Sequence, residues 1–384
     1  MMIRFLLILI LLIGVLLGGY TLLNRDDEAD VGAHTQLMPT MQTSSFGFAR
    51  AIEPYDWEFP ADHGAHPEFQ TEWWYYTGNL AAENGQRFGF QFTIFRRALT
   101  PFEPVSDSEW RTNQVYLAHF TVTDVAGNRF FQEQRINRGA ADLAGASVDP
   151  VYRVWVDDWQ IKGISATQTR ITAEASDFSV DLRLEPGKPP ALQGEQGLSA
   201  KSAEPGNASY YYSQSRLSTE GSMTVNGKTY TVSGATWMDH EFSSGALSDQ
   251  TQGWDWFGLQ LDDGRELMVG QIRLVDGDKD PAFSGLLVEA DGSTRLLAAA
   301  DFTITATGTW TSPHNGAVYP SGWEIRVDIG EAEPLELTLT PLILDQELTE
   351  GNVYWEGAVR IEGDATGYGY AELTGYLNAM RGRF

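Results

Sequence analysis

Hydrophobic and polar residues alternate along many short segments of this chain. In the segment RFGFQFTIFRR, residues 87–97, a strand would place every second side chain on the same face. One face then carries four hydrophobic residues, Phe88, Phe90, Phe92 and Ile94. The last part of the chain, GYGYAELTGYL, follows the same pattern, and no segment after the N-terminal region keeps a helical period. The pattern predicts an all-β protein.

Short turn signals separate the predicted strands. Asn84-Gly85 lies between a Trp/Tyr run and the segment 87–97, and this dipeptide predicts a type I′ hairpin. The same kind of pair recurs at Gly127-Asn128, Asn226-Gly227, Asp263-Gly264 and Asp291-Gly292. Strands joined by tight hairpins form an antiparallel meander, and closing the meander into a barrel removes its exposed edges. We expect two tandem lipocalin-like antiparallel β-barrel domains.

The chain divides into four predicted segments. Residues 1–24 hold an uncharged apolar run preceded by Arg4, which is long enough for a bilayer core of about 30 Å. This run is either a signal peptide or a membrane anchor, and both place the rest of the chain in the periplasm or another extracytoplasmic space. Residues 25–48 are expected to be a polar linker, residues 49–242 the first barrel and residues 243–384 the second.

Composition excludes several classes of function. The chain has 26 basic and 52 acidic residues and a net charge of −26, so its surface repels nucleic-acid phosphates. It has no cysteine, which rules out disulfides, thiolate metal sites and a cysteine nucleophile. Neither a P-loop nor a G-x-S-x-G nucleophile elbow occurs. We therefore expect no nucleic-acid partner.

The segment WMDHEF, residues 237–242, sets three ionisable residues beside aromatic ones. On a strand, Asp239 and Glu241 share a face with Trp237, whereas His240 lies on the opposite face. Either His240 or the two carboxylates can therefore face a pocket, but not all three. His240 can titrate near neutral pH, and a neighbouring carboxylate can hold it for acid–base chemistry. The alternative is a strand-end cluster that binds loop backbone.

The segment QTEWWYYTG predicts a pocket wall in which Glu72, Trp74 and Tyr76 share one face. A carboxylate beside two buried aromatic rings is costly unless it is paired. The candidate partners are Arg87, Arg96 and Arg97. The alternative to a pocket is an ion pair that ties together one end of the barrel.

Two further groups of residues are candidates for ligand contacts. Trp254 and Trp256 share a face with Gly258, and such rings can stack on a polyene or sterol-like ligand or stabilise a carbocation. The alternative is that they belong to the core of the second barrel. His119 lies in an alternating run, where it is either a barrel histidine with its hydrogen bonds made or a cavity residue.

The loop DHGAHPE holds two histidines and two carboxylates, Asp62, His63, His66 and Glu68. Imidazole and carboxylate groups can bind a metal ion. Histidines are common in loops, however, and we expect no metal site.

The segments DHGAHPEFQTEWWYYTGNL, SYYYSQSRL and VSGATWMDHEF resemble the carotenoid 1,2-hydratase family, also called hydroxyneurosporene synthase-like, and its secreted AttH-like relatives. The resemblance covers about residues 55–384 and implies two lipocalin-like barrels. In hydratase members it implies cofactor-free addition of water to an alkene of an acyclic carotenoid. It places the family's Asp-His pair on Asp239 and His240. Hydratases favour a tryptophan two residues after that histidine, where this chain has Phe242.

Residues and resemblance together predict an exported protein that binds a hydrophobic, isoprenoid or lipid-like small molecule in a barrel pocket. An inner-membrane transporter is a possible partner, because bacterial relatives sit beside transporter genes. The main alternative is a cofactor-independent hydratase or isomerase, and a secreted hydrolase is the third. The candidate catalytic residues are Asp239, His240 and Glu241. The candidate ligand-binding residues are Glu72, Trp74, Tyr76, His119, Trp237, Trp254 and Trp256.

Overall fold

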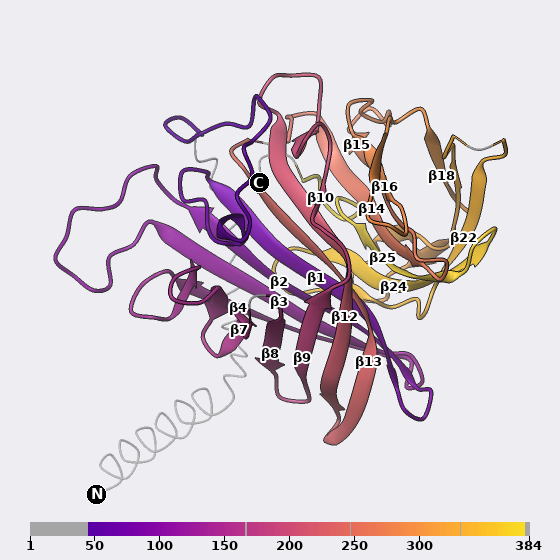
Figure 1. Cartoon of the computed structure of the whole chain (residues 1–384), viewed down its shortest axis with the longest axis horizontal. Helices are drawn as coiled ribbons and strands as arrows, with labels where there is room; N and C mark the ends of the chain where they lie inside the picture. Colours follow the sequence, from indigo (N-terminus) through magenta and orange to yellow (C-terminus); the bar gives the residue numbers. More distant parts are fainter. Residues whose placement is uncertain (1–44, 166, 246, 331, 381–384) are drawn as a thin grey trace, which may run out of the picture. The chain divides into compact units, whose positions relative to one another are not determined.

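The computed structural model describes residues 45–380 with the exception of residues 166, 246 and 331 (Figure 1). The predicted signal or anchor segment and most of the predicted linker lie outside the described residues. Within them, the one helical element is a 3₁₀ turn, η1 (Ala61–His63). No helix among these residues has the length and apolar character that a membrane crossing requires.

The first sheet is antiparallel and almost closes into a barrel. Its strands run in the order β4-β3-β2-β1-β13-β12-β9-β8-β7-β6-β5, and β10 and β11 pair with β12. The two end strands of this order, β4 and β5, also contact each other. The strand bounds are β1 (Thr71–Ala82), β2 (Arg87–Ala98), β3 (Gln114–Asp124), β4 (Arg129–Arg138), β5 (Ala144–Ser147), β6 (Arg153–Val156), β7 (Trp159–Gly163), β8 (Thr169–Glu174), β9 (Phe178–Pro186), β10 (Ala191–Leu192), β11 (Leu198–Ala200), β12 (Ala208–Val225) and β13 (Lys228–Ser243).

The second sheet is a similar antiparallel, nearly closed barrel. Its strand order is β17-β16-β15-β14-β25-β24-β22-β21-β18, with β23 paired to β24 and a separate hairpin of β19 and β20. Leu297 from one end strand and Phe302 from the other belong to the same buried core, which shows the near closure. The bounds are β14 (Thr251–Leu261), β15 (Glu266–Leu274), β16 (Gly285–Val288), β17 (Thr294–Leu297), β18 (Phe302–Ala306), β19 (Thr309–Thr311), β20 (Val318–Pro320), β21 (Trp323–Val327), β22 (Leu335–Pro341), β23 (Glu347–Leu348), β24 (Tyr354–Gly363) and β25 (Gly367–Leu373).

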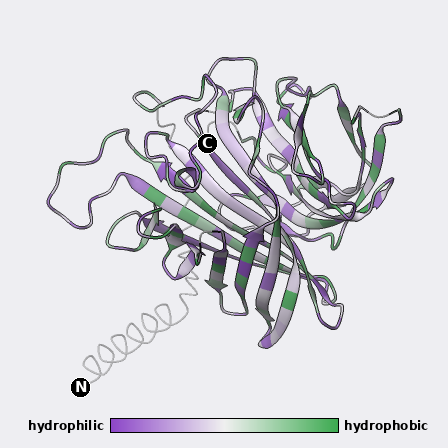
Figure 2. Ribbon diagram, in the orientation of Figure 1, coloured by the Kyte–Doolittle hydropathy of each residue, from purple (hydrophilic) through white to green (hydrophobic). Residues whose placement is uncertain are grey.

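The alternating pattern correctly predicted which side chains fill the first barrel. Hydrophobic and hydrophilic residues alternate along several strands in Figure 2. Phe88, Phe90, Phe92 and Ile94 are all fully buried and belong to one core with Trp159. The interior at these positions is therefore filled by side chains.

The predicted hairpins form, but only one of the five predicted pairs, Asn226-Gly227, has the backbone of a type I′ turn. Asn226 and Gly227 both have positive φ and join β12 to β13, as a type I′ turn requires. At the first hairpin only Gly85 has positive φ, and its N–H donates to the carbonyl of Ala82 at 2.8 Å. One more residue lies in this loop than a type I′ turn allows, so the turn is a type I turn with a glycine bulge.

The stretch 185–209, whose glycines and prolines are typical of a long loop, contains secondary structure. It contains β10 and β11, which lie along β12 with Ala191 opposite Ser213 and Leu198 opposite Tyr210. The chain passes from the first sheet to the second between Ser243 and Thr251.

The outer faces of the two sheets pack against each other. We call the side chains between them the inter-barrel layer. Its apolar part consists of Tyr75, Tyr211, Trp237, Trp256, Met268, Ile272, Phe283, Ala358 and Tyr370. Hydrogen bonds cross the layer, and one of them joins Asn79 Nδ2 to the carbonyl of Gly369 at 3.0 Å. The pink and indigo strands β13, β12 and β1 accordingly lie beside the orange and yellow strands β14 and β25 in Figure 1. Strands in this position are buried on both faces.

Candidate functional site

Strand β13 sends its ionisable side chains to two different places. Asp239 faces the inter-barrel layer and hydrogen-bonds Trp237, whereas His240 faces the interior of the first barrel and stacks on Trp74. The predicted alternation is therefore confirmed. The Asp-His pair that the resemblance implies is adjacent in sequence, but the two side chains do not form one acid–base pair.

Inside the first barrel lies a group of residues that we call the histidine cluster: Asp62, His63, His66, Glu72, Arg96, Tyr212 and His240. Its centre is the fully buried Glu72. Glu72 Oε1 lies 2.8 Å from both His66 Nδ1 and His240 Nε2. Arg96 Nε donates to Glu72 Oε2 at 2.7 Å. The expected arginine partner of Glu72 is thus Arg96, which β2 places directly opposite Glu72.

Charges in the histidine cluster keep Glu72 ionised. Burial alone would raise the pKa of Glu72, but the Arg96 charge and the hydrogen bonds from His240 and His66 hold it well below its usual range. Burial lowers the pKa of His240. Burial acts in the same direction on His66, but hydrogen bonding to Glu72 and the Glu72 charge outweigh it and raise the pKa of His66. An extra proton therefore favours His66 over His240.

The other members of the histidine cluster extend these contacts toward the N-terminal loop. Tyr212 Oη lies 2.6 Å from His63 Nδ1 and 3.2 Å from His240 Nδ1. His66 Nε2 lies 3.4 Å from Asp62 Oδ1. Burial lowers the pKa of His63 to about 4, so this imidazole is neutral at pH 7. The loop motif is therefore attached to the barrel through both of its histidines.

Three residues of the histidine cluster have the donor set of a divalent-metal site. One ligand atom each from His66, Glu72 and His240 lies within 4.8 Å of the other two. In the structure both histidines hydrogen-bond Glu72, so the same arrangement is also explained by a hydrogen-bond network without a metal ion. The absence of a metal remains a prediction.

Trp74 and Tyr76, two candidate ligand contacts, are core residues of the first barrel. The Trp74 indole N–H donates to the carbonyl of His63 at 2.9 Å, and its ring lies 4.9 Å from the ring of His240. Trp74, Tyr76 and Glu72 face the packed interior of the first barrel. Trp237 and Trp256 lie in the inter-barrel layer, so the structure does not bring these two groups of candidate residues together.

The inter-barrel layer holds a second polar group, which we call the acid–aromatic cluster: Tyr75, Tyr211, Ser213, Trp237, Asp239, Trp256, Glu356 and Glu372. Asp239 Oδ1 accepts hydrogen bonds from Trp237 Nε1 at 2.7 Å and from Ser213 Oγ at 2.5 Å. Asp239 Oδ2 accepts one from Tyr211 Oη at 2.7 Å. The register explains this convergence, because Ser213 on β12 lies directly opposite Asp239 on β13.

The second sheet completes the acid–aromatic cluster. Trp256 Nε1 donates to Tyr211 Oη at 3.2 Å, and Tyr75 Oη donates to Glu356 Oε1 at 2.6 Å. The rings of Trp237 and Trp256 meet edge to face with centroids 6.0 Å apart. The alternative that Trp256 belongs to the core of the second barrel is therefore wrong, because Trp256 packs on the outside of that barrel.

Carboxyl groups in the acid–aromatic cluster hold their protons unusually firmly. Burial raises the pKa of Asp239 to about 7, although its three hydrogen-bond donors act in the opposite direction. Burial likewise raises the pKa of Glu372 to about 7 and that of Glu356 well above its usual value. Among the described residues, no basic side chain forms an ion pair with Asp239. This cluster can therefore supply a proton near neutral pH.

Glu241 and Trp254 lie at the border of the acid–aromatic cluster. Glu241 pairs with Lys201 at 2.9 Å, and the Lys201 ammonium also lies 5.1 Å from the ring of Tyr211. Trp254 is half-buried and packs against the inter-barrel layer. The structure thus places Trp237, Trp254, Trp256 and Glu241 in one region.

His119 also faces the second sheet, a position that neither of its two predicted alternatives specified. Its Nδ1 lies 2.8 Å from Tyr354 Oη on β24. Burial lowers the pKa of His119 to about 4, so its imidazole is neutral at pH 7.

Sequence reasoning named only three of the eight residues of the acid–aromatic cluster, Trp237, Asp239 and Trp256. Tyr211 and Ser213 lie within the motif SYYYSQSRL, and their shared face on a strand is a signal that points to them. Glu356 and Glu372 come from the last two strands and have no local signal, because only the packing of the two sheets brings them to Tyr75 and Asp239.

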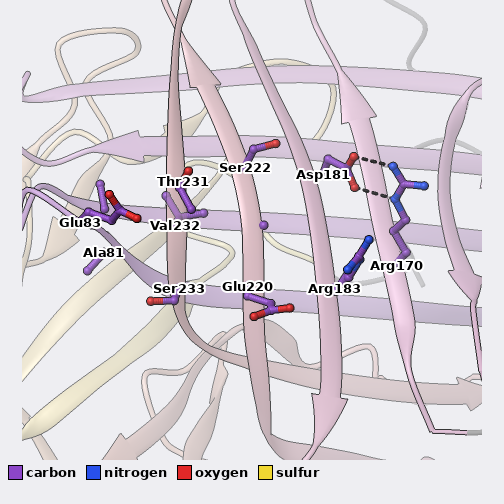
Figure 3. A pocket seen from close by; sticks show the side chains of 12 residues that line it. Ala81, Glu83, Arg170, Asp181, Arg183, Glu220, Ser222, Thr231, Val232 and Ser233 are labelled. Carbon is purple, nitrogen blue, oxygen red and sulfur yellow. Dashed lines mark hydrogen bonds and ion pairs between the residues drawn. The ribbon is translucent and has the colours of Figure 1, made fainter.

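A separate surface hollow of about 530 Å³ lies across β1, β8, β9, β12 and β13 (Figure 3). Most of its lining residues are polar, and Arg170 forms an ion pair with Asp181 there. Glu220 and Arg183 also line it. It contains none of the candidate site residues and no aromatic side chain.

Comparison with known proteins agrees with this architecture. The AttH-like family model matches residues 50–376. The crystal structure of an AttH protein from Nitrosomonas europaea is 38% identical with a TM-score of 0.77, covering 86% of this chain and 100% of that one. Kievitone hydratase from Nectria haematococca has a TM-score of 0.64 at 14% identity, covering 87% of this chain and 99% of that one, a likeness of fold alone. No curated protein sequence matches significantly. The chain therefore belongs to the AttH-like family.

Proposed function

We propose that this protein binds a hydrophobic small molecule in the inter-barrel layer. The observation that supports the proposal most strongly is the acid–aromatic cluster, where Asp239 lies among Trp237, Trp256 and Tyr211 without a cationic partner among the described residues. Ligand sites typically combine apolar walls with a few convergent polar groups and groups of shifted pKa.

The inter-barrel layer suits a ligand better than the first barrel interior does. Buried side chains fill both regions, such as Phe92 and Trp159 in the interior and Trp237 and Tyr370 in the layer, so the interior differs chiefly in its charges. Its charged residues already bind one another through Glu72. We therefore move the predicted barrel pocket to the layer between the barrels.

Export and partners remain part of the proposal. The apolar N-terminal run supports an extracytoplasmic location, and a protein that carries a lipid-like molecule there could serve an inner-membrane transporter. The net charge of −26 continues to argue against nucleic acid as a partner.

The direct test is to purify the protein gently from its own host, extract it with organic solvent and identify ligands by mass spectrometry. We expect an isoprenoid or acyl lipid in the wild-type extract and a clear loss of it in Trp256→Ala. Trp110→Ala is the matched control, because Trp110 is an exposed residue outside the layer. Extracts without any hydrophobic molecule, or an equal yield from both variants, would contradict the proposal.

A hydratase or isomerase is the second candidate function, and the proton affinity of Asp239 favours it. A carboxyl with a pKa of about 7 can give its proton to an alkene carbon, and the faces of Trp237 and Trp256 can stabilise the resulting cation. Water then adds to the cation and returns a proton to the Asp239 carboxylate. Kievitone hydratase, whose fold is similar, is named for a hydration reaction. In this scheme His240 takes no direct part, because it faces the other side of β13.

Single-turnover assays with an isoprenoid alkene distinguish the two functions. If Asp239 is the acid, Asp239→Asn should lower the rate by roughly 10²–10⁴-fold while the alkene still binds. His240→Gln should leave the chemical step unchanged in any variant that folds. Full turnover by Asp239→Asn would exclude Asp239 as the acid, and no turnover by the wild type would leave binding as the function.

A further inference from the structure

A row of polar side chains crosses the outer face of the first sheet beside the acid–aromatic cluster. Trp237 on β13 lies opposite Thr77 on β1, Thr77 lies opposite Gln91 on β2, and Gln91 lies opposite Thr121 on β3. The next row contains Asp239. The polar row therefore begins at an aromatic wall of the proposed ligand site and continues away from it.

These three polar side chains are buried but incompletely hydrogen-bonded. Thr77, Gln91 and Thr121 are at most 1% exposed. Thr77 Oγ1, Gln91 Oε1 and Thr121 Oγ1 nevertheless have no hydrogen-bond partner among the described residues. Buried polar groups in native proteins are normally paired, and a group of adjacent unpaired ones requires an explanation.

The second sheet contributes another buried oxygen that lacks a hydrogen-bond partner among the described residues. Glu356 Oε1 accepts the hydrogen bond from Tyr75, but Glu356 Oε2 has no partner in the described part of the chain. Because the side chain of Glu356 is fully buried against the outer face of β1, both sheets present incompletely bonded oxygens to the inter-barrel layer.

The chemistry of these atoms indicates what would bind there. Gln91 Oε1 only accepts hydrogen bonds, whereas a threonine hydroxyl can donate or accept. A ligand group that satisfies both must donate a hydrogen bond to Gln91 Oε1, and an alcohol can do so while it accepts one from a threonine hydroxyl. A carbonyl or an ether cannot donate to Gln91 Oε1.

We propose that Thr77, Gln91 and Thr121 form a polar subsite that binds the hydroxyl group of a largely hydrophobic ligand. The proposal rests on the proposed function and names the class of ligand, an isoprenoid-like alcohol. Neighbouring strands lie about 4.8 Å apart, so the span from β13 to β3 is roughly 14 Å. A molecule of that length can place its apolar part on Trp237 and Trp256 and its hydroxyl on the polar row.

Binding of farnesol and of β-farnesene tests this subsite, since both have a sesquiterpene skeleton and only farnesol has a hydroxyl. Quenching of tryptophan emission should show that the wild type binds farnesol about fivefold more tightly, the value of one net hydrogen bond. Thr121→Val and Gln91→Met should remove this preference and leave β-farnesene binding unchanged. Thr231→Val, in the exposed surface hollow, should keep the preference.

Unfolding midpoints separate a ligand subsite from a structural role. Thr121→Val removes an unpaired hydroxyl, so without ligand the midpoint should stay unchanged or rise. If Thr121→Val lowers the unfolding midpoint and weakens the binding of farnesol and β-farnesene equally, Thr121 serves the fold. That result would overturn the subsite. Equal affinity of the wild type for both probes would overturn the subsite and leave the hydrophobic site standing. If neither probe binds, the proposed function fails as well.

Discussion

Two buried carboxyl groups on neighbouring strands of this protein behave in opposite ways. Glu72 on β1 is fully buried, and Arg96 together with two histidines holds its pKa well below the usual range. Asp239 on β13 is almost as deeply buried, but its partners are the neutral donors Trp237, Ser213 and Tyr211, and its pKa rises to about 7. The comparison shows that burial alone does not determine which carboxyl stays ionised, since Glu72 has a cation and two histidines as partners and Asp239 has neutral donors only.

The difference between Glu72 and Asp239 also indicates different roles for the two clusters to which they belong. An ionised Glu72 ties the N-terminal loop, β2 and β13 together, because His66, Arg96 and His240 all bind it. A carboxyl that titrates near pH 7 beside aromatic rings can bind or protonate a ligand. We therefore assign a structural role to the histidine cluster and the ligand chemistry to the acid–aromatic cluster.

Among the substitutions that test this difference, Glu72→Gln should cause the largest loss of unfolding free energy. The substitution leaves the Arg96 guanidinium buried without its carboxylate, which typically costs about 3–5 kcal/mol of unfolding free energy. Asp239→Asn keeps a neutral side chain of the same shape and should cost far less at pH 7. Urea unfolding of both variants measures the difference, and equal losses would contradict the assignment.

The pH dependence of stability should show the proton affinity of Asp239. Because burial raises the pKa of Asp239 from 3.8 to about 7, the folded state binds a proton that the unfolded state releases above pH 4. Titration of Asp239 should thus lower stability by up to a few kcal/mol as pH rises from about 4 to 7, and Glu372 contributes in the same direction. His63 and His119, whose pKa values burial lowers to about 4, contribute in the opposite direction. Asp239→Asn should therefore remove the Asp239 part, so that stability falls less, or rises more, over this range than in the wild type.

The exposed carboxylate Asp291 provides the control for that titration. Hydrogen bonds from Ser293 lower the pKa of Asp291, so Asp291→Asn should leave the pH dependence between pH 4 and 7 as it is in the wild type. The same pH dependence in Asp239→Asn and in the wild type would show that Asp239 does not titrate in the folded state over this range.

Phe242→Trp should produce an intermediate effect on stability. Phe242 stands where hydratases that the chain resembles favour a tryptophan, and its ring stacks on His66 with centroids 3.7 Å apart. Phe242 is fully buried, so the larger indole would overpack the histidine cluster and cost about 1–3 kcal/mol. Calorimetry measures this loss. A variant as stable as the wild type would show that the position accepts both rings.

Trp256→Phe should produce the smallest effect. It removes the N–H that donates to Tyr211 Oη at 3.2 Å and keeps an aromatic ring in the inter-barrel layer. One net hydrogen bond contributes about 1 kcal/mol and the smaller ring leaves a void, so the unfolding free energy should fall by about 1–2 kcal/mol. Chemical denaturation of Trp256→Phe against Trp110→Phe, an exposed position, checks the value.

Alternation and turn signals predicted much of the fold because they depend on neighbours in sequence. Phe88 to Ile94 fill the first barrel as expected, and the pairing of Glu72 with an arginine followed from the cost of an unpaired buried carboxylate. The turn at Gly85 was wrong because loop length, which the dipeptide alone does not reveal, decides between hairpin types.

The site was harder to predict because it depends on packing between distant strands. Alternation separated Asp239 from His240, but it could not show that both faces of β13 are buried. Tyr75 and Glu356 lie 281 positions apart in the chain, and only the contact between the two sheets makes them hydrogen-bonded partners.

Photocrosslinking with a diazirine analogue of farnesol tests the central claim most directly, since mass spectrometry of the peptides shows where the molecule binds. Ligand binding between the barrels predicts labels on the segments 237–241 and 254–256, and loss of those labels when excess farnesol competes. Labels confined to the interior of the first barrel, around Tyr76 and Tyr212, would contradict the account.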